Sequence, residues 1–348
     1  MKPYKELTYL GRARRMRRLA SVALEAFGLA EARFKLVRVA GNTLFRVFAP
    51  QPTPAADDVH IDGQYMLRVH QPGYQAAGAI ELELAWLAAM RRDANLPVPE
   101  PVPTLDGKLL TQVSIAGIPG ERNCSLLRWV RGRFIPKNIR PHHYRAQGRL
   151  MARLHDHAAH WQIPPGLTKR HWDWDGLFKD VEGADMPESE VWALLPRRYH
   201  EHFKAVTKKV RRVMDAWGQG PDVYGLIHAD LGVDANLLFW RGEARAIDFD
   251  DSGFGYYMYD LALSLEHCRE HAEYPQFREA LLGGYAEVRP LSQEQLEHYE
   301  LFMAAFYVYL ALWAAAMVPR HPEHREELFE RLNRSAGLAA LIVPDALG

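Results

Sequence analysis

Cysteine is scarce in this chain: Cys124 and Cys268 are the only two among 348 residues. Secreted proteins of this length often carry several disulfides, so the scarcity favours a reducing compartment, and we expect the cytoplasm. Net charge is also missing, because 43 basic residues balance 43 acidic ones. The balance hides an asymmetry, since acidic residues outnumber basic ones by 16 to 7 from Asp250 onward. This excess indicates either attraction of a cationic substrate or a solvated acidic face.

Long apolar runs are almost absent as well. The N-terminal GRARRMRR segment lacks the apolar stretch that a signal peptide needs. Its arginines are compatible with nucleic-acid binding, but the apolar residues spaced around them favour a basic amphipathic helix, and we expect no nucleic-acid partner. The apolar stripe of that helix comprises Leu10, Met16, Leu19, Val22, Leu24 and Phe27.

One longer run does occur: Leu301–Val318 has 18 residues without a charge. It meets the lower length limit of a membrane span, but six of its residues are Ala and two are Tyr. No second segment of this kind supports it. We therefore predict a helix buried in a helical lobe and no membrane partner.

The first 125 residues have the pattern of a small sheet that carries one helix. Apolar-rich runs flank the turn Ala40-Gly41-Asn42 and predict a hairpin, followed by a Pro- and Asp-rich loop at Ala49–Gly63. Helical spacing of apolar residues predicts a helix over Ala79–Arg92. The remaining expected strands are Tyr65–Val69 and two runs around the Asp106-Gly107 turn, the second ending near Ile115.

Past Trp129, long amphipathic stretches predict helices at roughly Pro141–His160, Glu188–Trp217 and most of Tyr257–Leu341. A mostly β front and a mostly α rear are typical of a bilobal α+β enzyme. We expect a small N-terminal lobe with an antiparallel sheet at residues 1–126 and a larger, helical C-terminal lobe at residues 127–348.

The segment Leu226–Ala262 contains most of the residues suited to catalysis. His228-Ala229-Asp230 follows a short apolar run typical of a buried strand, which places Asp230 on the loop after that strand. A carboxylate there can accept a hydrogen bond from a hydroxyl and align it for in-line attack on a phosphoryl group. An isolated Asp would more often cap its own turn, but the polar residues that follow favour chemistry.

Asn236 begins a short strand, and Asp248 lies near the end of the return strand, Ala244–Phe249, of the same expected hairpin. The hairpin would bring an amide oxygen and a carboxylate within reach of one hard cation, which suits Mg²⁺. Asp250 and Asp251 add negative charge that a cation would offset. Asp260, at the start of a helix, is expected to brace the catalytic loop through backbone N–H groups, or else to be an ordinary helix-start Asp.

These motifs resemble the aminoglycoside phosphotransferase/choline kinase-like superfamily, the small-molecule relatives of protein kinases. Within it, the chain looks most like the branch of bacterial stress-response Ser/Thr kinases and homoserine-kinase-type enzymes. The resemblance covers nearly the whole chain through LFRVF, MLRVHQPG, ELELAWLAAM, PVPEPVPTLDG, LLRWVRG, GRLMARLHDHAAHW and the Leu226–Ala262 segment. It implies a protein-kinase-like fold and transfer of the γ-phosphoryl group of ATP to a hydroxyl with the help of Mg²⁺. The N-terminal lobe would bind the nucleotide, and the C-terminal lobe would carry the catalytic and substrate-binding groups.

The resemblance also implies roles for single residues of the C-terminal lobe. Asp230 would be the catalytic base or the group that orients the hydroxyl, and His228 would support its loop. Asn236 and Asp248 would be Mg²⁺ ligands, with Asp250 as a further one.

In the N-terminal lobe, Arg68 would occupy the place of the phosphate-contacting lysine, and Glu83 would pair with it. The loop over the phosphates would be formed by Gly41, Asn42 and Thr43, and the adenine would be received by backbone groups of Arg128, Trp129 and Val130.

Three departures from the family pattern leave room for a degenerate nucleotide-binding protein. Asn236 is the sixth residue after Asp230 rather than the fifth, so the loop must bulge or Asp234 must share the metal role. Arg68 presents a planar fork instead of a point charge, although a fork can clamp two phosphate oxygens and is common in the stress-kinase-like branch. The turn at Gly41 has one glycine and does not fit the G-x-G-x-x-G of protein kinases.

The phosphoryl acceptor is either a small-molecule hydroxyl or a protein Ser/Thr, and the sequence does not distinguish the two. The aromatic residues expected to pack a core, or else to line a pocket for a cation, are Trp161, Trp172, Trp174 and Phe178. The segment His267–His271 matches the zinc-protease pattern H-x-x-E-H, but nothing nearby offers a third ligand, so a zinc hydrolase has little support.

Overall fold

Apolar residues alternate along Asn42–Phe48 in the N-terminal half, so that every second residue of this strand is buried. The computed structural model describes residues 2–51, 57–135 and 137–343. The N-terminal lobe holds a five-stranded antiparallel sheet in the order β1-β2-β3-β5-β4. Its strands are β1 (Arg33–Ala40), β2 (Asn42–Phe48), β3 (His60–Val69), β4 (Thr111–Val113) and β5 (Arg122–Val130).

The predicted hairpin is confirmed, with Ala40 of β1 paired to Asn42 of β2. Two boundaries were wrong. β3 begins at His60, inside the stretch expected to be loop, of which residues 52–56 lie outside the described residues. The first run before the Asp106-Gly107 turn forms only an isolated bridge between Pro101 and Leu127, because its prolines lack the N–H that a ladder requires.

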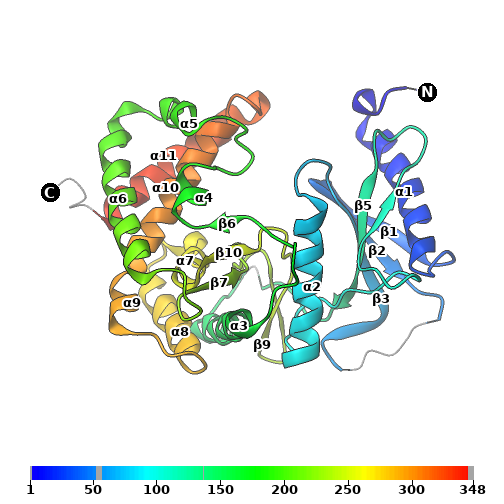
Figure 1. Ribbon diagram of the computed structural model, residues 1–348, viewed down its shortest axis with the longest axis horizontal. Coiled ribbons are helices and arrows are strands. Elements are labelled where there is room, and N and C mark those ends of the chain that lie inside the picture. Colours follow the sequence, from blue (N-terminus) through cyan, green and yellow to red (C-terminus); the bar gives the residue numbers. More distant parts are fainter. Residues whose placement is uncertain (1, 52–56, 136, 344–348) are drawn as a thin grey trace.

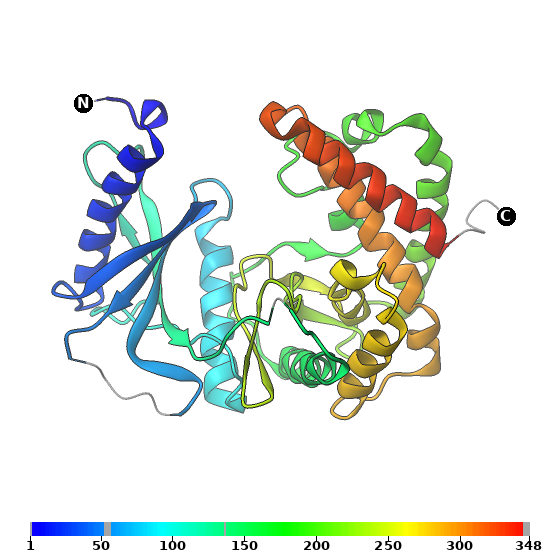
Figure 2. The same ribbon diagram turned by 180° about the vertical axis from the view of Figure 1, so that it is seen from behind.

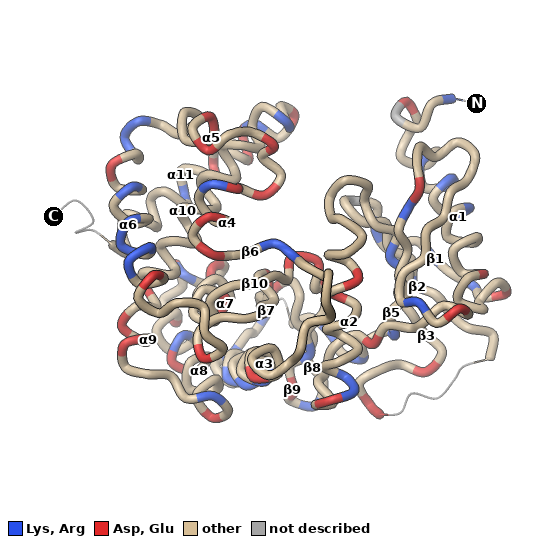
Figure 3. The backbone as a smooth tube through the Cα atoms, viewed as in Figure 1, with Lys and Arg blue, Asp and Glu red and all other residues tan. Residues whose placement is uncertain are grey.

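Two helices cover the sheet from opposite sides (Figure 1). α1 (Tyr9–Ala26) follows the 3₁₀ turn η1 (Tyr4–Glu6) and packs on the outer face with Met16, Leu19, Leu24 and Phe27. Leu10 and Val22 were wrongly placed on the buried stripe: at 3.6 residues per turn they lie off that face, and they are 66% and 41% exposed. Figure 3 shows the basic residues of α1 spaced along the helix.

α2 (Ala77–Ala94) lies between the sheet and the C-terminal lobe (Figure 1). Its buried side chains, among them Ile80, Leu84, Leu87 and Met90, belong to the core of the C-terminal lobe, whereas α1 and the sheet share a smaller core of their own. α2 is therefore fastened to the larger lobe although it belongs in sequence to the smaller one.

The C-terminal lobe is mostly helical, with a three-stranded sheet in the order β6-β10-β7 and a two-stranded hairpin β8-β9. Its helices are α3 (Pro141–His160), α4 (Trp174–Phe178), α5 (Glu188–Leu194), α6 (His200–Trp217), α7 (Tyr257–Leu263), α8 (Tyr274–Ala286), α9 (Gln293–Glu297), α10 (Tyr299–Met317) and α11 (Arg325–Ile342). Its strands are β6 (His171–Trp172), β7 (Tyr224–Ile227), β8 (Leu237–Trp240), β9 (Glu243–Ala246) and β10 (Gly253–Tyr256). Its 3₁₀ turns are η2 (Arg197–Tyr199), η3 (Glu266–Cys268) and η4 (Pro322–His324).

The long apolar run forms α10, which by length and composition could cross a membrane. However, 78% of its most apolar 18-residue stretch is buried inside the protein. The expected core helix is confirmed, and Figure 2 shows it packed beside α11. The stretch expected as helix at Glu188–Trp217 is divided instead, since Pro196 separates α5 from α6. The two-lobed α+β architecture predicted from the sequence is confirmed.

Candidate active site

The loop after β7 carries Asp230. Ala229, one residue before it, has a left-handed φ of +63°, a conformation that costs an L-residue about 1–2 kcal/mol. The buried carboxylate of Asp260 on α7 holds this conformation, because it accepts the backbone N–H of Ala229 at 2.7 Å and that of His228 at 3.3 Å. The bracing role expected of Asp260 is confirmed. Sequence reasoning missed His155 of α3, whose Nε2 lies 3.0 Å from the same carboxylate.

His228 joins this loop to the end of the β8-β9 hairpin. Its Nδ1 accepts the backbone N–H of Asp230 at 3.3 Å, so its Nε2 carries the hydrogen and donates to the carbonyl of Ile247 at 3.0 Å. Burial lowers the pKa of His228, which favours this neutral ring. The side chain is fully covered and lies 4.5 Å from the ring of Phe249, centroid to centroid. His228 therefore supports the loop and does not reach the open site.

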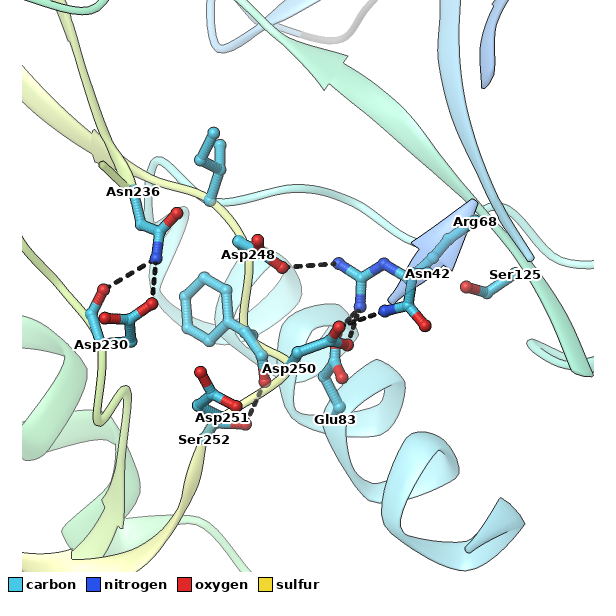
Figure 4. Close-up of polar contacts among 12 residues, drawn as sticks. Asn42, Arg68, Glu83, Ser125, Asp230, Asn236, Asp248, Asp250, Asp251 and Ser252 are labelled. Carbon is cyan, nitrogen blue, oxygen red and sulfur yellow. Dashed lines mark hydrogen bonds and ion pairs between the residues drawn. The ribbon is translucent and has the colours of Figure 1, made fainter. Parts of the chain in front are cut away.

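The extra residue between Asp230 and Asn236 is absorbed by a turn. The N–H groups of Ala235 and Asn236 both approach the carbonyl of Gly232, at 3.3 and 3.2 Å. The Asn236 side-chain amide still donates to the Asp230 carboxylate at 2.7 Å and to its carbonyl at 2.9 Å (Figure 4). Asp234 takes a different partner, the Nδ1 of His267 at 3.4 Å.

The hairpin places Asn236 and Asp248 at the same end, as the pattern predicted. β8 pairs with β9 in antiparallel register, and the N–H of Ile247 donates to the carbonyl of Asn236 at 3.0 Å. Asp248 has a φ of +62°, which turns the chain sharply after the hairpin. Both side chains line one cavity.

Arg68 of β3 forms the electrostatic centre of the site (Figure 4). Its guanidinium lies 2.8 Å from Glu83, 2.6 Å from Asp250 and 3.6 Å from Asp248. Burial alone would lower the pKa of Arg68, but the carboxylates of Asp250, Glu83 and Asp248 outweigh it and raise that pKa. The expected pairing with Glu83 is present, and the planar fork of Arg68 lets it also contact both aspartates.

The turn at Gly41 lies next to this cluster. Gly41 has a φ of +60°, a conformation that glycine adopts without the strain of a side chain. Asn42 donates its amide to Asp250 and accepts the N–H of Gln71 at 2.9 Å, so the turn is joined to the C-terminal lobe. Thr43 is buried and pairs with Val69 in the sheet.

A cavity of about 440 Å³ lies between the sheet and the hairpin. Arg128, Trp129 and Val130 of β5 line one side, and Asn236 and Asp248 line another. Other lining residues are mostly apolar, including Leu44, Met66, Leu127 and Leu238. Apolar walls with a polar end are suited to a purine base that carries phosphates.

A second cavity, of about 890 Å³, lies on the other side of Asp230. Most of its lining belongs to the C-terminal lobe, and residues 71–74 of the N-terminal lobe complete it. Its acidic lining residues are Glu182, Asp185, Asp230, Asp234, Asp251 and Glu266, and its aromatic ones are Tyr74, Trp172, Phe306, Tyr309 and Trp313. Two of the acids are neutralised, since Asp185 pairs with Arg320 at 2.7 Å and Glu266 with Arg334 at 3.2 Å. The charge that remains near Asp230 is negative.

Burial and neighbouring negative charges raise the pKa of several carboxyl groups in and around the site. Burial, followed by the charges of Asp251 and Asp248, raises the pKa of Asp230 to about 7. Burial and Asp251 likewise raise the pKa of Glu182 to about 7. The pKa of Asp250 also rises to about 7 through burial, although Arg68 opposes it. This crowding indicates that the site lacks part of its positive charge when no ligand is bound.

The donor set fits a hard divalent cation. Asn236 and Asp248 offer an amide and a carboxylate oxygen at one end of the nucleotide-sized cavity. Asp250 lies beside them, because it contacts the same guanidinium of Arg68 as Asp248 does. A bound cation would lower the raised pKa of Asp250. The described part of the chain has no group of three or more His, Cys, Asp or Glu side chains arranged for a metal. A cation held here would therefore draw further ligands from phosphate oxygens and water.

The zinc-protease pattern has another structural explanation. The pattern would need an α-helix with His267 and His271 on one face, but the chain forms the 3₁₀ turn η3 at His267. The Nε2 of His267 is hydrogen-bonded to the hydroxyl of Tyr144 at 3.1 Å. The four aromatic residues considered for a cation pocket lie in different places: Trp172 lines the larger cavity, Phe178 is in the core, and Trp161 and Trp174 lie elsewhere on the lobe.

Sequence reasoning missed two residues of the site, Lys169 and Glu182. Lys169 is buried under the turn at Phe249, and Glu182 faces the larger cavity beside Tyr309. Lys169 comes from the irregular stretch between α3 and β6, and Glu182 from the one between α4 and α5. Neither stretch has a periodicity or motif that could have pointed to these residues.

Proteins of known function resemble this chain in sequence and in fold. A homoserine kinase of Agrobacterium fabrum is 29% identical over 64% of this chain and 68% of its own length. Among solved structures, a microcompartment-associated aminopropanol kinase is 27% identical with a TM-score of 0.75, over 93% of this chain and 96% of the other. An amicoumacin kinase in complex with AMP-PNP, Ca²⁺ and Ami, 17% identical over 91% of this chain and 96% of its own, shares the fold with a TM-score of 0.68.

The family model described as "Phosphotransferase enzyme family" matches residues 51–332, which is most of the chain and includes Arg68, Asp230, Asn236 and Asp248. The chain therefore belongs to the phosphotransferase enzyme family, whose members here include small-molecule kinases.

Proposed function

We propose that this protein transfers the γ-phosphoryl group of ATP, in the presence of Mg²⁺, to the hydroxyl of a small cationic amino alcohol. One observation carries the proposal: the hydrogen-bonded pair Asp230–Asn236 stands between the two cavities. Asn236 lines the cavity suited to a nucleotide, Asp230 lines the acidic one, and Ala235 between them lines both. A phosphoryl group carried by one ligand would thus meet a hydroxyl of the other at Asp230.

In the nucleotide cavity, Arg128, Trp129 and Val130 would receive the adenine, and Arg68 would hold phosphate oxygens with its fork. Gly41, Asn42 and Thr43 would approach the phosphates from the N-terminal lobe. The position of this turn supports the role, because Asn42 contacts Asp250 at the proposed metal site.

Asn236, Asp248 and Asp250 would hold Mg²⁺, which when bound offsets the negative charge of the phosphates. The amide nitrogen of Asn236 is engaged by Asp230, so its amide oxygen is the atom presented to a cation. Asp248 lies 3.6 Å from Arg68, close enough for both to act on the same phosphate group.

Asp230 would accept the hydrogen bond of the acceptor hydroxyl and orient it for in-line attack. Its neighbour Asn236 fixes one carboxylate oxygen, which leaves the other for the substrate. With a pKa of about 7, Asp230 can also take up the proton as the phosphoryl group is transferred. Positioning and electrostatics would supply most of the catalysis.

The acceptor is proposed to be cationic because its cavity is acidic and aromatic. Asp251 and Glu182 have no cation of their own within ion-pair distance among the described side chains, and Trp172 and Tyr309 stand beside them. An ammonium group would be attracted by both carboxylates and by the ring faces. The related kinases named for homoserine and aminopropanol act on molecules with an amine and a hydroxyl, which supports this class.

We also place the protein in the cytoplasm. Both cysteines, Cys124 and Cys268, are buried free thiols, which suits a reducing compartment that contains ATP.

The decisive experiment measures ADP release by purified protein with Mg²⁺ and ATP against a panel of amino alcohols, with the matching amine-free diols as controls. We expect turnover with at least one amino alcohol and a phosphorylated product in the mass spectrum. Asp230→Asn should lower kcat by about 10²–10⁴-fold and leave ATP binding within about twofold. The surface variant Asp215→Asn, on α6, is the matched control. Full activity of Asp230→Asn would contradict the proposal, and so would phosphorylation of the protein itself instead of a small molecule.

A further inference from the structure

Lys169 is a buried cation to which the proposed mechanism gives no role. It lies in the segment between α3 and β6, and only 6% of its surface is exposed. Its ammonium donates to the carbonyls of Phe249 and Asp250, at 3.1 and 3.0 Å, and to the hydroxyl of Ser252 at 2.7 Å. These three acceptors use all three N–H bonds of the ammonium.

The acceptors of Lys169 all belong to the turn that carries the proposed metal ligands. Within this turn, Ser252 also donates its hydroxyl to the carbonyl of Phe249 at 2.6 Å. The carbonyl of Asp250 accepts a second bond, from Gln75 of the N-terminal lobe at 2.6 Å. The main chain of Phe249 and Asp250 is therefore held from both lobes, and Lys169 supplies the charged contact.

Lys169 also shares a carboxylate with Arg68. One oxygen of Glu83 lies 2.8 Å from Arg68, and the other lies 3.7 Å from the Lys169 ammonium. That second oxygen is buried and has no hydrogen-bond partner in the described part of the chain, so Lys169 is the cation it faces. Burial raises the pKa of Glu83, but Arg68 and Lys169 outweigh it, and the carboxyl stays ionised between them.

Near Glu83, α2 also packs against the turn that contains Phe249. Trp86, on α2 three residues after Glu83, meets the ring of Phe249 edge to face at 5.7 Å between centroids. α2 is already part of the core of the C-terminal lobe. Glu83, Phe249 and Lys169 thus form one junction of α2, the metal-ligand turn and the segment before β6.

We propose that Lys169 is a positioning residue that fixes the turn Asp248–Ser252 and shares Glu83 with Arg68, so that Asp248, Asp250 and Arg68 face the metal–nucleotide complex together. The proposal rests on the proposed function, because it concerns the arrangement that would bind Mg²⁺ and phosphates. It assigns to Lys169 no contact with substrate.

The physical consequence of losing the ammonium has two parts. Two buried carbonyls would lose a donor, which frees the turn to relax. Glu83 would then be neutralised by Arg68 alone, so Arg68 would be drawn toward α2 and away from Asp248 and Asp250. Both changes weaken binding of the metal-bound nucleotide and leave apolar binding of the base intact.

The test compares Lys169→Met, which keeps length and removes charge, with Lys179→Met, the same change at a surface lysine paired with Asp175. Calorimetry gives the Kd of ADP with Mg²⁺ and with a chelator, and the ratio of the two is the gain due to metal. We expect Lys169→Met to reduce this gain by about tenfold or more. The metal-free Kd should rise by a smaller factor, since Arg68 is proposed to hold phosphate oxygens as well. Lys179→Met should match wild type in both.

A lysine that only stabilises the fold would lower the melting temperature and leave the metal-dependent gain unchanged, and that result would overturn the proposal. Should Lys169→Met fail to fold, Ser252→Ala decides, because it removes one acceptor and keeps the lysine. It should reduce the gain in the same direction by about threefold, and an unchanged gain there also overturns the proposal. Wild-type protein that binds Mg²⁺-ADP without phosphorylating any acceptor would refute the proposed function alone, since the calorimetry does not depend on turnover.

Discussion

The side-chain amide of Asn236 donates to the carboxylate of Asp230 at 2.7 Å although the two residues stand one position further apart than the kinase pattern requires. The turn that closes on the carbonyl of Gly232 takes up the extra residue. The longer loop is therefore compatible with a working site, and the spacing alone is no argument for a degenerate protein.

This pairing leads to a prediction for Asn236→Ala. The substitution removes the amide oxygen proposed for the metal and the donor that fixes Asp230. We expect the Mg²⁺ concentration for half-maximal activity to rise at least about tenfold, with a parallel loss in kcat, in a titration of ADP release. Asn333→Ala, an exposed position on α11, is the control and should leave both values unchanged. An unaltered Mg²⁺ requirement in Asn236→Ala would remove Asn236 from the metal site.

Arg68 gives a prediction that separates charge from geometry. Arg68→Met leaves Glu83 and Asp250 without their guanidinium, and the free energy of unfolding should fall by about 3–5 kcal/mol in denaturant titrations. Arg68→Lys keeps the charge but loses the fork, so stability should fall less.

For the same Arg68→Lys protein, the KM for ATP should rise about tenfold, the effect of losing one charge-assisted hydrogen bond of about 1.5 kcal/mol. The change should be confined to ATP, with the KM of the acceptor unaltered. A lysine variant with wild-type KM for ATP would mean that the fork geometry of Arg68 is not used on phosphates.

The parts of this site that the sequence predicted are those set by local register. Once the strands before and after the Arg241-Gly242 turn pair, Asn236 and Asp248 must share an end, because antiparallel pairing fixes which residues face each other. The pairing of Arg68 with Glu83, present at 2.8 Å, was implied by the family resemblance instead. The expected places of Gly41 and of Arg128, Trp129 and Val130 beside a nucleotide came from the family resemblance, whereas no strand was predicted at β5.

What the sequence did not predict depends on contacts between distant segments. Lys169 reaches the turn at Phe249 across 80 residues, and it comes from an irregular stretch in which a lysine has no pattern to mark it. Glu182 lies in another such stretch, and its raised pKa depends on burial and on Asp251, which is distant in the sequence. The prediction that Leu10 and Val22 are buried was wrong for a simpler reason. Loosely spaced apolar residues do not determine which face of the helix packs on the sheet.

Glu182 predicts a pH dependence that should appear only with cationic acceptors. Burial and the charge of Asp251 raise its pKa to about 7, so the carboxylate that attracts an ammonium forms as the pH rises through that value. An alkyl ammonium stays charged over this range. Consequently kcat/KM for an amino alcohol should rise between pH 6 and 8 more steeply than kcat/KM for the matching diol.

Asp230 titrates in the same window, with a pKa of about 7, but it acts on any hydroxyl. The ratio of the two kcat/KM values therefore cancels the contribution of Asp230 and isolates that of Glu182. In Glu182→Gln this ratio should fall and become independent of pH. A ratio that keeps its pH dependence in the Gln variant would assign the ammonium site to another carboxylate, with Asp251 as the next to test.

The hydrogen bonds from Asp260 to the loop before Asp230 lead to a prediction about stability and activity. Asp260→Ala leaves the N–H groups of His228 and Ala229 without an acceptor, each at a cost of about 1–3 kcal/mol, so the free energy of unfolding should fall by about 2–6 kcal/mol. Asp230 would lose its fixed position, and kcat should fall while the KM for ATP stays the same. Asp260→Asn keeps one acceptor oxygen and should be intermediate in both measurements.

Ala229→Gly tests the same loop from the opposite direction. Glycine removes the cost of the left-handed φ, about 1–2 kcal/mol, and adds about 0.5–1 kcal/mol of chain entropy to be lost on folding. The wild-type background should therefore gain about 0.5–1 kcal/mol in the free energy of unfolding. The gain should be smaller in Asp260→Ala, because a loop that is free to leave the left-handed conformation has less strain for glycine to remove. Equal gains in the two backgrounds would show that Asp260 does not hold the strained residue.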